Sequence, residues 1–421
     1  MSIFRGYVFR NLLTSLTAML LLVFSNPVSG EEVTVKLPAD KKPPAVKPAP
    51  PPEPVKELDV IDLVFHPKNR DAPSENVPWK MRVAGIPYIS YNPATSLQIG
   101  VAGNIGYYGG DLATTSISDV IASAAYTLRN QVLIAIRSSI FTNNNQFNLQ
   151  GDWRFNMTNQ DTWGLGPMKS NSDKDLIDFN WVRGYETVYF RVGPSFYIGV
   201  GFNADWQYSI IDQNVKAGKH SYMNDYYGGN EPSTTLAIGL SGGLLFDSRD
   251  NQINPTKGYL ANANFKVFPK AFGGADNWES LWLEFRAYPH LGGRNVLAFW
   301  LWGWFAFGQA PYLDLPAVGW DMYGRSGRGF AAGRIRGNNL LYAEVEYRIH
   351  LMKNDLLGMV VFANATAASD PLTGSFTGAD PAGGVGLRIK VNRKSESNLA
   401  VDLGYGERQS LCFYIAIQEA F

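Results

Sequence analysis

Residues 196–206 read Phe-Tyr-Ile-Gly-Val-Gly-Phe-Asn-Ala-Asp-Trp, and this stretch decides the fold. From Phe196 to Trp206 every second side chain is apolar, whereas those between them are glycine, polar or tyrosine. Successive side chains of a β-strand point to opposite faces, so the alternation predicts a strand with one apolar face. Residues 259–267 and 340–349 repeat the pattern. An apolar face opposite a polar, glycine-rich face is typical of strands in a membrane-spanning β-barrel.

Sixteen such segments follow one another to the last residue. We expect strands near 82–92, 95–108, 115–128, 130–143, 146–157, 178–191, 194–210, 233–247, 257–268, 278–288, 294–308, 338–350, 356–367, 383–392, 397–406 and 410–421. Connections after even-numbered segments are mostly short, and several after odd-numbered segments are long. Outer-membrane barrels have short periplasmic turns and longer external loops. The sequence therefore predicts an all-β fold, a 16-stranded antiparallel barrel with both termini in the periplasm. A soluble β-sandwich is the alternative, but its polar faces would be rich in Lys and Glu.

The first 78 residues are unlike the rest. Arg5 and Arg10, an apolar run from Leu12 to Phe24 and small residues up to Gly30 form the three parts of a signal peptide, residues 1–30. The run is about 13 residues long, shorter than the roughly 20 that a spanning helix needs. Residues 31–56 are a proline-rich linker, which we expect to be an extended periplasmic arm. Residues 57–78 form a transition segment, and 79–421 the barrel.

The composition excludes several classes of function. Lysine plus arginine equals aspartate plus glutamate, 37 against 37, which gives no basic surface for nucleic acid. The four histidines are scattered, so we expect no metal site, no cofactor and no catalytic residues. Residues 239–243 match the G-x-S-x-G letters of a hydrolase, but they lie inside a predicted strand and not at the strand-to-helix turn that the motif requires. The chain is therefore predicted not to be an enzyme.

Four motifs, in order, resemble the bacterial surface antigen family, the outer-membrane assembly-factor superfamily of the BamA and TamA type. The first is a turn containing Asp247, Arg249, Asp250, Pro255 and Gly258. The second is Arg328-Gly329-Phe330 in a long loop, although Gly327 stands where the family has an apolar residue. The third runs from Gly333 through Glu344 and Glu346 to Arg348. The fourth is a C-terminal assembly signal, with Phe413, Ile415, Ile417 and Phe421 expected on one face of the last strand. The resemblance covers roughly residues 80–421.

The resemblance implies that the long loop, residues 309–337, folds into the barrel. In the family the loop arginine lies against acids on the next two strands; Arg328 and Glu346 match the arginine and the first acid. Asn364 stands where the family usually has Asp, which implies a weaker clamp. Glu344 is a further candidate partner. The alternative is that the loop arginines face solvent. Trp300, Trp302 and Trp304 alternate with apolar residues, so one face of that strand is expected to line a plugged lumen.

The family's assembly factors carry periplasmic repeats of about 75 residues, and none fits before this barrel, so a barrel-only member is implied. We expect a bacterial outer-membrane protein that assists insertion or translocation of protein or lipid. A small-solute channel and a structural barrel tethered by its arm are the alternatives. The expected partners are outer-membrane lipid, the barrel assembly machinery, and a periplasmic partner or peptidoglycan at the proline-rich arm.

Overall fold

The structure is a computed structural model, and it describes residues 81–92, 94–167, 169–170, 174–289, 293–392, 396–407, 411–417 and 419–421. The signal peptide, the linker and the transition segment that we predict lie outside the described residues. No helix among the described residues is long and apolar enough to cross a membrane.

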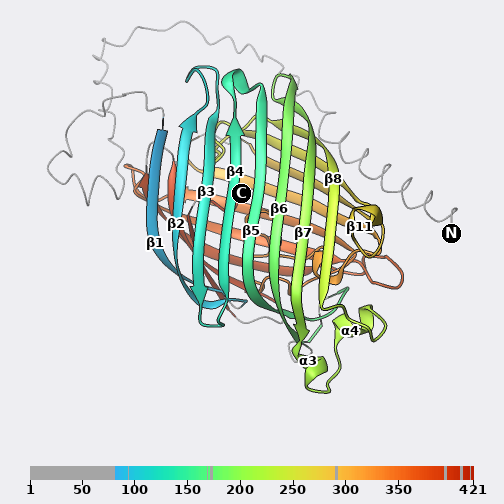
Figure 1. The fold of residues 1–421 in the computed structure, drawn as a ribbon. Helices are drawn as coiled ribbons and strands as arrows, with labels where there is room; N and C mark the ends of the chain where they lie inside the picture. Colours follow the sequence, from blue (N-terminus) through green and yellow to red (C-terminus); the bar gives the residue numbers. More distant parts are fainter. Residues whose placement is uncertain are drawn as a thin grey trace, which may run out of the picture. The chain divides into compact units, whose positions relative to one another are not determined.

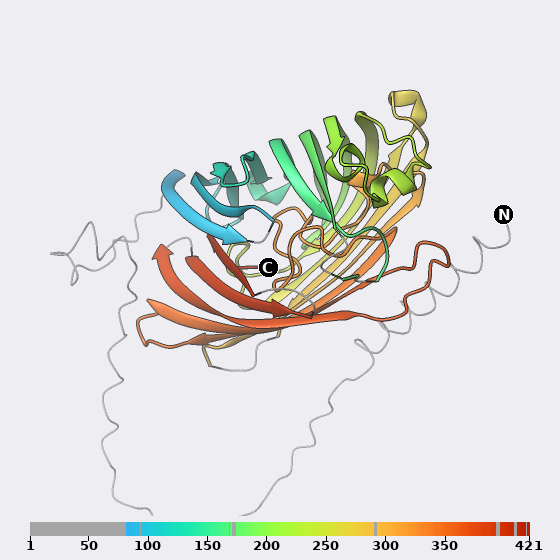
Figure 2. The same ribbon diagram turned by 90° about the horizontal axis from the view of Figure 1, so that it is seen from below.

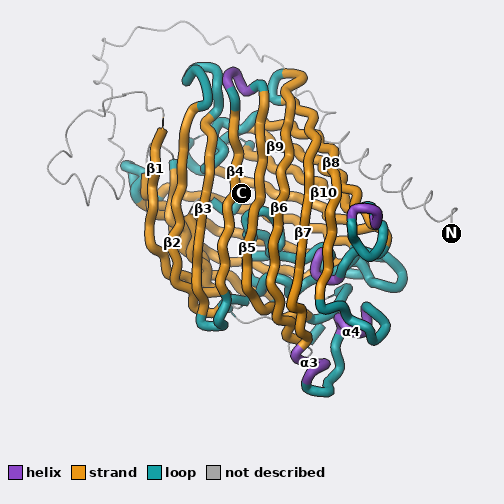
Figure 3. The backbone as a smooth tube through the Cα atoms, viewed as in Figure 1, coloured by secondary structure: helices purple, strands orange, loops and turns teal. Residues whose placement is uncertain are grey.

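Sixteen antiparallel strands form one sheet, and each strand pairs with its neighbours in the sequence (Figures 1 and 3). They are β1 Met81–Asn92, β2 Ser96–Tyr108, β3 Ile117–Thr127, β4 Val132–Phe141, β5 Phe147–Thr162, β6 Asp175–Gly193, β7 Phe196–Asp212, β8 Thr234–Asp247, β9 Gly258–Phe268, β10 Trp278–Tyr288, β11 Val296–Gly308, β12 Asn339–His350, β13 Leu357–Ala368, β14 Asp380–Asn392, β15 Ser397–Gly406 and β16 Cys412–Ile417. The predicted number and order of strands are confirmed. The 239–243 motif lies within β8, as expected.

The two faces of the sheet differ as the alternation predicts. In β7, Val200 is 71% exposed on the outer face, whereas Asp205 is fully buried on the inner face. The register carries each face across neighbouring strands: Phe202 pairs with Leu240 outside, and Asn203 with Gly239 inside. An apolar outer band facing lipid and a polar interior are the result.

Long and short connections lie at opposite ends of the barrel. We call one end the loop end; its connections include 163–174, 213–233 with helices α3 Gln213–Lys216 and α4 Tyr222–Tyr226, and 309–338 (Figure 1). The other is the turn end, with connections such as 194–195 and 248–257. β5 and β6 are longer than predicted, because their polar residues at the loop end remain paired as far as Thr162 and Asp175.

The sheet is nearly closed. β1 lies next to β16, but in the described part of the chain β1 pairs only with β2, and β16 only with β15. We call this junction the seam. β16 is six residues long, half the length of β1. The seam therefore leaves two strand edges without a continuous ladder.

The interior is filled by the long loop, residues 309–338, which runs inside the barrel (Figure 2). Its buried residues include Leu315, Val318, Phe330 and Ile335. The three tryptophans of β11 face inward: Trp300 packs edge-on against Tyr342, Trp302 stacks on Tyr342, and the indole N–H of Trp304 donates to Ser280 at 2.9 Å. The predicted inward loop and indole-lined lumen are confirmed.

The end of the chain differs from the prediction. β16 ends at Ile417, and residues 419–421 turn into the lumen, where Figure 2 places the C-terminus. Phe421 is 4% exposed and packs against Trp300, with ring centroids 5.3 Å apart. The expectation that Phe421 shares one face of the last strand with Phe413 and Ile415 is therefore wrong, because the strand ends before it. Phe421 therefore packs against aromatic rings and an arginine inside the barrel, and does not face the lipid.

Phe421→Ala should lower the free energy of unfolding by about 3 kcal/mol, because truncating a buried Phe leaves a cavity. Leu411→Ala is the matched control, since Leu411 is 56% exposed just before β16. The measurement is thermal unfolding in detergent, followed as loss of the fast-migrating folded band on a gel. Equal effects of both substitutions would show that Phe421 does not pack inside.

Candidate functional site

Arg328 lies inside the barrel, against strands β12, β13 and β15, among three carboxylates. Its guanidinium donates to Asp402 on β15 at 2.8 Å, to Glu346 on β12 at 2.5 Å and to Glu344 on β12. The guanidinium also lies over the ring of Phe362, 3.8 Å from its centroid. We call Arg328, Glu344, Glu346 and Asp402 the loop clamp. Burial lowers the pKa of Arg328, but the three carboxylates raise it well above its usual value, so the group stays charged.

The main chain around Arg328 is also held. The side-chain amide of Asn364 donates to the carbonyl of Arg328 at 2.9 Å. The N–H of Gly329 donates to the hydroxyl of Tyr414 on β16, and that hydroxyl donates to the carbonyl of Phe330 at 2.9 Å. Gly329 has φ +113°, and a Cβ there would lie 2.8 Å from Ala382. Only glycine fits this position, because the backbone is left-handed and the wall is close.

A second layer of ion pairs connects the loop clamp to the end of the chain. Arg388 on β14 donates to Asp402 at 2.5 Å and to Glu419 at 2.6 Å. Arg348 on β12 donates to Glu346 at 2.8 Å and to the main-chain oxygen of Phe421 at 2.7 Å. The loop, strands β12, β14 and β15, and residues 419–421 thus form one charged network.

The turn motif closes the turn end. Arg249 donates twice to Asp247, at 2.9 and 2.8 Å. Asp250 accepts the N–H groups of Asn251, Thr256 and Lys257, which fixes the turn. Gly258 has φ +95°, and a Cβ there would meet the Ser248 carbonyl at 2.3 Å. The carbonyl of Pro255 accepts from Arg348 at 3.0 Å, so the turn joins the same network.

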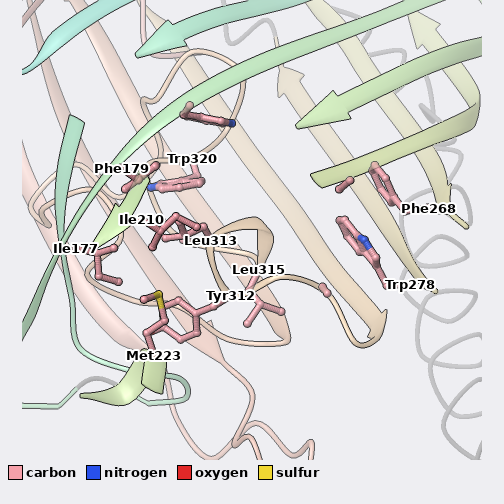
Figure 4. Packing of buried hydrophobic residues seen from close by; sticks show 14 residues of the cluster. Ile177, Phe179, Ile210, Met223, Phe268, Trp278, Tyr312, Leu313, Leu315 and Trp320 are labelled. Carbon is pink, nitrogen blue, oxygen red and sulfur yellow. The ribbon is translucent and has the colours of Figure 1, made fainter. Parts of the chain in front are cut away.

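An apolar cluster anchors the first half of the loop near the loop end. Tyr312, Leu313 and Leu315 pack with Ile177, Phe179, Ile210 and Met223 from β6, β7 and α4 (Figure 4). Trp320 stacks on Trp181, with centroids 5.2 Å apart. Asp314 is buried beside them and accepts from Gln207 on β7 at 2.6 Å. Burial, and then the Asp205 carboxylate, raise the pKa of Asp314 to about 8.

The structure brings together Arg328, Glu344, Glu346 and Asn364, as the resemblance implies. It places the turn motif at the turn end, joined to the same network through Pro255 and Arg348. Asn364 holds the loop carbonyl and not the guanidinium. Asp402, Arg388 and Glu419 are the residues that sequence reasoning missed. Asp402 is the one acidic residue among residues 397–406. The alternation of apolar side chains in this segment predicts that its side chain faces inward. That signal could have identified it. Among the described residues no group of side chains could hold a metal ion.

Arg328→Ala should lower the free energy of unfolding by about 3–5 kcal/mol, less where water enters the lumen, because three buried carboxylates lose their partner. Glu346→Gln and Asp402→Asn should act in the same direction. Each double variant with Arg328→Ala should cost less than the sum of its singles. Thermal unfolding and proteolysis of the loop measure both effects.

The matched control is Arg294→Ala, which removes a more exposed ion pair with Asp355 at the turn end. Such pairs contribute about 0–1 kcal/mol. Strict additivity of the clamp variants would contradict the contacts described for Arg328.

The buried carboxyl of Asp314 gives a pH dependence with a defined sign. The folded protein holds this proton up to a pH of about 8, whereas an unfolded chain releases it near pH 4. Stability from this group is therefore fully present at low pH and is lost as the pH rises towards 8. Asp314→Asn should flatten the fall in unfolding temperature between pH 6 and 9. An unchanged pH profile in this variant would exclude Asp314 as its source.

Comparisons with known proteins agree with this geometry. The Omp85 superfamily domain matches residues 138–393. Barrels of this superfamily are transporters and assembly factors and not enzymes, which confirms the prediction that the chain is not an enzyme. None of the curated proteins matches the chain.

Two solved structures have a similar fold. BamA from Haemophilus ducreyi lacking POTRA domains 1–3 has a TM-score of 0.51 at 15% identity, over 80% of this chain and 70% of that chain. CdiB from Escherichia coli has a TM-score of 0.52 at 9% identity, over 80% of this chain and 62% of that chain. At these identities the likeness concerns the fold alone. The family match covers more than half of the sequence, and this chain therefore belongs to the Omp85 superfamily, as an outer-membrane β-barrel.

Proposed function

We propose that this barrel assists the insertion or translocation of protein or lipid at the bacterial outer membrane, and that the seam between β1 and β16 is where it acts. The observation that carries the proposal is the pair of strand edges that share no continuous ladder. Unpaired N–H and C=O groups at an edge can accept an incoming strand. In lipid they are costly unless a client or a local distortion of the bilayer satisfies them.

A cavity of about 580 Å³ lies behind the seam. It is lined by both edge strands, through residues such as Tyr88 and Tyr414, and by the loop clamp residues Arg328 and Asp402. A change in the seam would therefore reach the loop clamp directly. We propose that the clamp holds the loop inside the lumen while the seam opens and closes. Tyr414, which bonds both Gly329 and Phe330, would connect the two.

The filled lumen favours this role over a small-solute channel. The loop, the 248–257 turn and residues 419–421 all occupy the interior, and a second cavity of about 250 Å³ is lined by charged residues such as Asp152, Arg183 and Arg286. An open pore would need the loop to leave. We expect low, flickering conductance from the full chain in a planar bilayer, and more conductance from Arg328→Ala. A large steady conductance from the unmodified chain would favour the channel.

The orientation and the partners follow the same proposal. β1 begins and β16 ends at the turn end, so short turns on the periplasmic side would place both termini in the periplasm. The proline-rich arm, residues 31–56, would then meet a periplasmic partner or peptidoglycan. The C-terminal assembly signal, including Phe413 and Ile415, would present β16 to the barrel assembly machinery before Phe421 enters the lumen.

The test is to join the seam covalently. Cysteine pairs are scanned along residues 86–90 of β1 and 413–416 of β16 in a Cys412→Ala background, and the pair that forms a disulfide is kept. Assembly of a client barrel into vesicles containing the purified full chain should stop when this pair is oxidised and recover on reduction. The control is a pair joining β8 and β9, such as Leu244 with Ala263, which are already register partners. Equal client assembly in both redox states of the seam pair would refute the proposal.

A further inference from the structure

The lipid-facing wall of β4 to β7 carries a polar cluster at mid-height. On β5 the outer side chains from Phe147 to Met157 are apolar or glycine, and so are those on β7 from Phe196 to Trp206. On β6 the outer side chains from Val182 to Val192 include Glu186, which the register places opposite Gly151 on one side and Phe202 on the other. Ser138 on β4 is the other neighbour of Gly151 on this face.

Two glycines shape this cluster. Trp153 pairs with Gly184 and lies flat across it, since a Cβ on Gly184 would meet the indole ring at 3.0 Å. Glu186 lies across Gly151 in the same way: a Cβ on Gly151 would be 2.6 Å from both the Glu186 carboxylate and the Ser138 hydroxyl. The indole N–H of Trp153 donates to the carboxylate at 3.1 Å. The carboxylate is therefore held against the wall beside two polar groups and is open towards the lipid.

Glu186 lies at a depth in the membrane where an ionisable side chain costs free energy. Val188, Phe190 and Val192 extend the outer face towards the turn end, and they are 37%, 45% and 49% exposed. Val182 and Gly184 extend it towards the loop end. Glu186 thus lies midway along the apolar band. An ionisable group at that depth is destabilising in lipid, and its presence there points to a function.

We propose that Glu186, with Trp153 and Ser138, is a lateral docking site for a second membrane protein that carries an N–H donor, from Arg, Lys, Asn or Gln, in its lipid-facing surface. Charge complementarity selects this occupant. Acyl chains have no donor to offer the carboxylate. A second copy of this chain is disfavoured too, because the described outer faces of β4 to β7 contain no Lys or Arg in the band, and a symmetric contact would oppose two carboxylates.

The site is separate from the seam. Strands β2 to β5 lie between β6 and β1, and the sheet order places the nine strands β7 to β15 between β6 and β16 by the other route. Docking on β5 and β6 would therefore leave the seam free for a client. The proposal stands whether or not the seam inserts clients, because it rests on the lipid-facing wall alone.

The experiment is photo-crosslinking of the full chain in its native outer membrane. A benzophenone amino acid replaces Val188, the next outward residue to Glu186 on β6, or Val361, an outward residue of β13 that is 45% exposed and serves as the position control. We expect a heterologous adduct at residue 188 and none at 361. Its crosslinked peptide should lie in a membrane-spanning segment with Arg, Lys, Asn or Gln. Glu186→Leu should reduce the adduct about tenfold or more, as expected for one lost charge-assisted hydrogen bond.

Two variants separate the carboxylate from general effects. Glu279→Leu removes another outward acid, at the end of β10, and should leave the adduct unchanged. Glu186→Gln retains a hydrogen-bonding group without the charge and should give an intermediate yield. A heat-modifiable folded band confirms that each variant has assembled. The proposal is overturned by an adduct of two copies of this chain, by lipid adducts alone, or by a yield at residue 188 that is the same with and without the Glu186 carboxylate.

Discussion

In the hydrocarbon of a membrane every unpaired main-chain N–H or C=O costs several kcal/mol, so a chain without apolar helices can cross only as a closed sheet. The pairing of sixteen strands in sequence order satisfies this constraint along most of the sheet. It also fixes which side chains face lipid and which face the lumen, because the register carries each face from strand to strand. The seam between β1 and β16 is where the constraint is least fully met, and for that reason we place the proposed function there.

The interior follows from a second constraint, the cost of a buried unpaired charge. Arg328 on the inward loop brings a permanent charge into the lumen, and carboxylates on β12 and β15 form ion pairs with it. Such a network is weak evidence for stability as a whole, but removing one partner is costly because it leaves the other buried charges unpaired. Arg348 and Arg388 extend it to Phe421 and Glu419, so the loop, the last residues and the 248–257 turn depend on one another.

The free-energy cost of an unpaired charge also applies to Glu186, on the outer face of the barrel wall. Glycines at 151 and 184 let the carboxylate and the Trp153 ring lie flat, and the indole N–H satisfies part of the charge. In the proposed docking site, a partner protein supplies a further donor to this carboxylate.

The sequence by itself determined the class of fold, the number of strands and the face that each side chain occupies, because period-two alternation is a local property of extended backbone. The resemblance of its motifs to those of the family also identified Arg328, Glu344, Glu346 and the turn motif. Only the tertiary structure decided that Asp402 completes the clamp, that Asn364 holds a carbonyl, and that Phe421 enters the lumen. These depend on which inward positions of β12, β13 and β15 meet across the closed lumen. No local sequence pattern shows which of these positions come close together. Phe421 continues the alternation of Phe413 and Ile415, but the strand ends before it. Side chains of three distant strands, Tyr288 on β10, Trp300 on β11 and Arg348 on β12, decide where it lies.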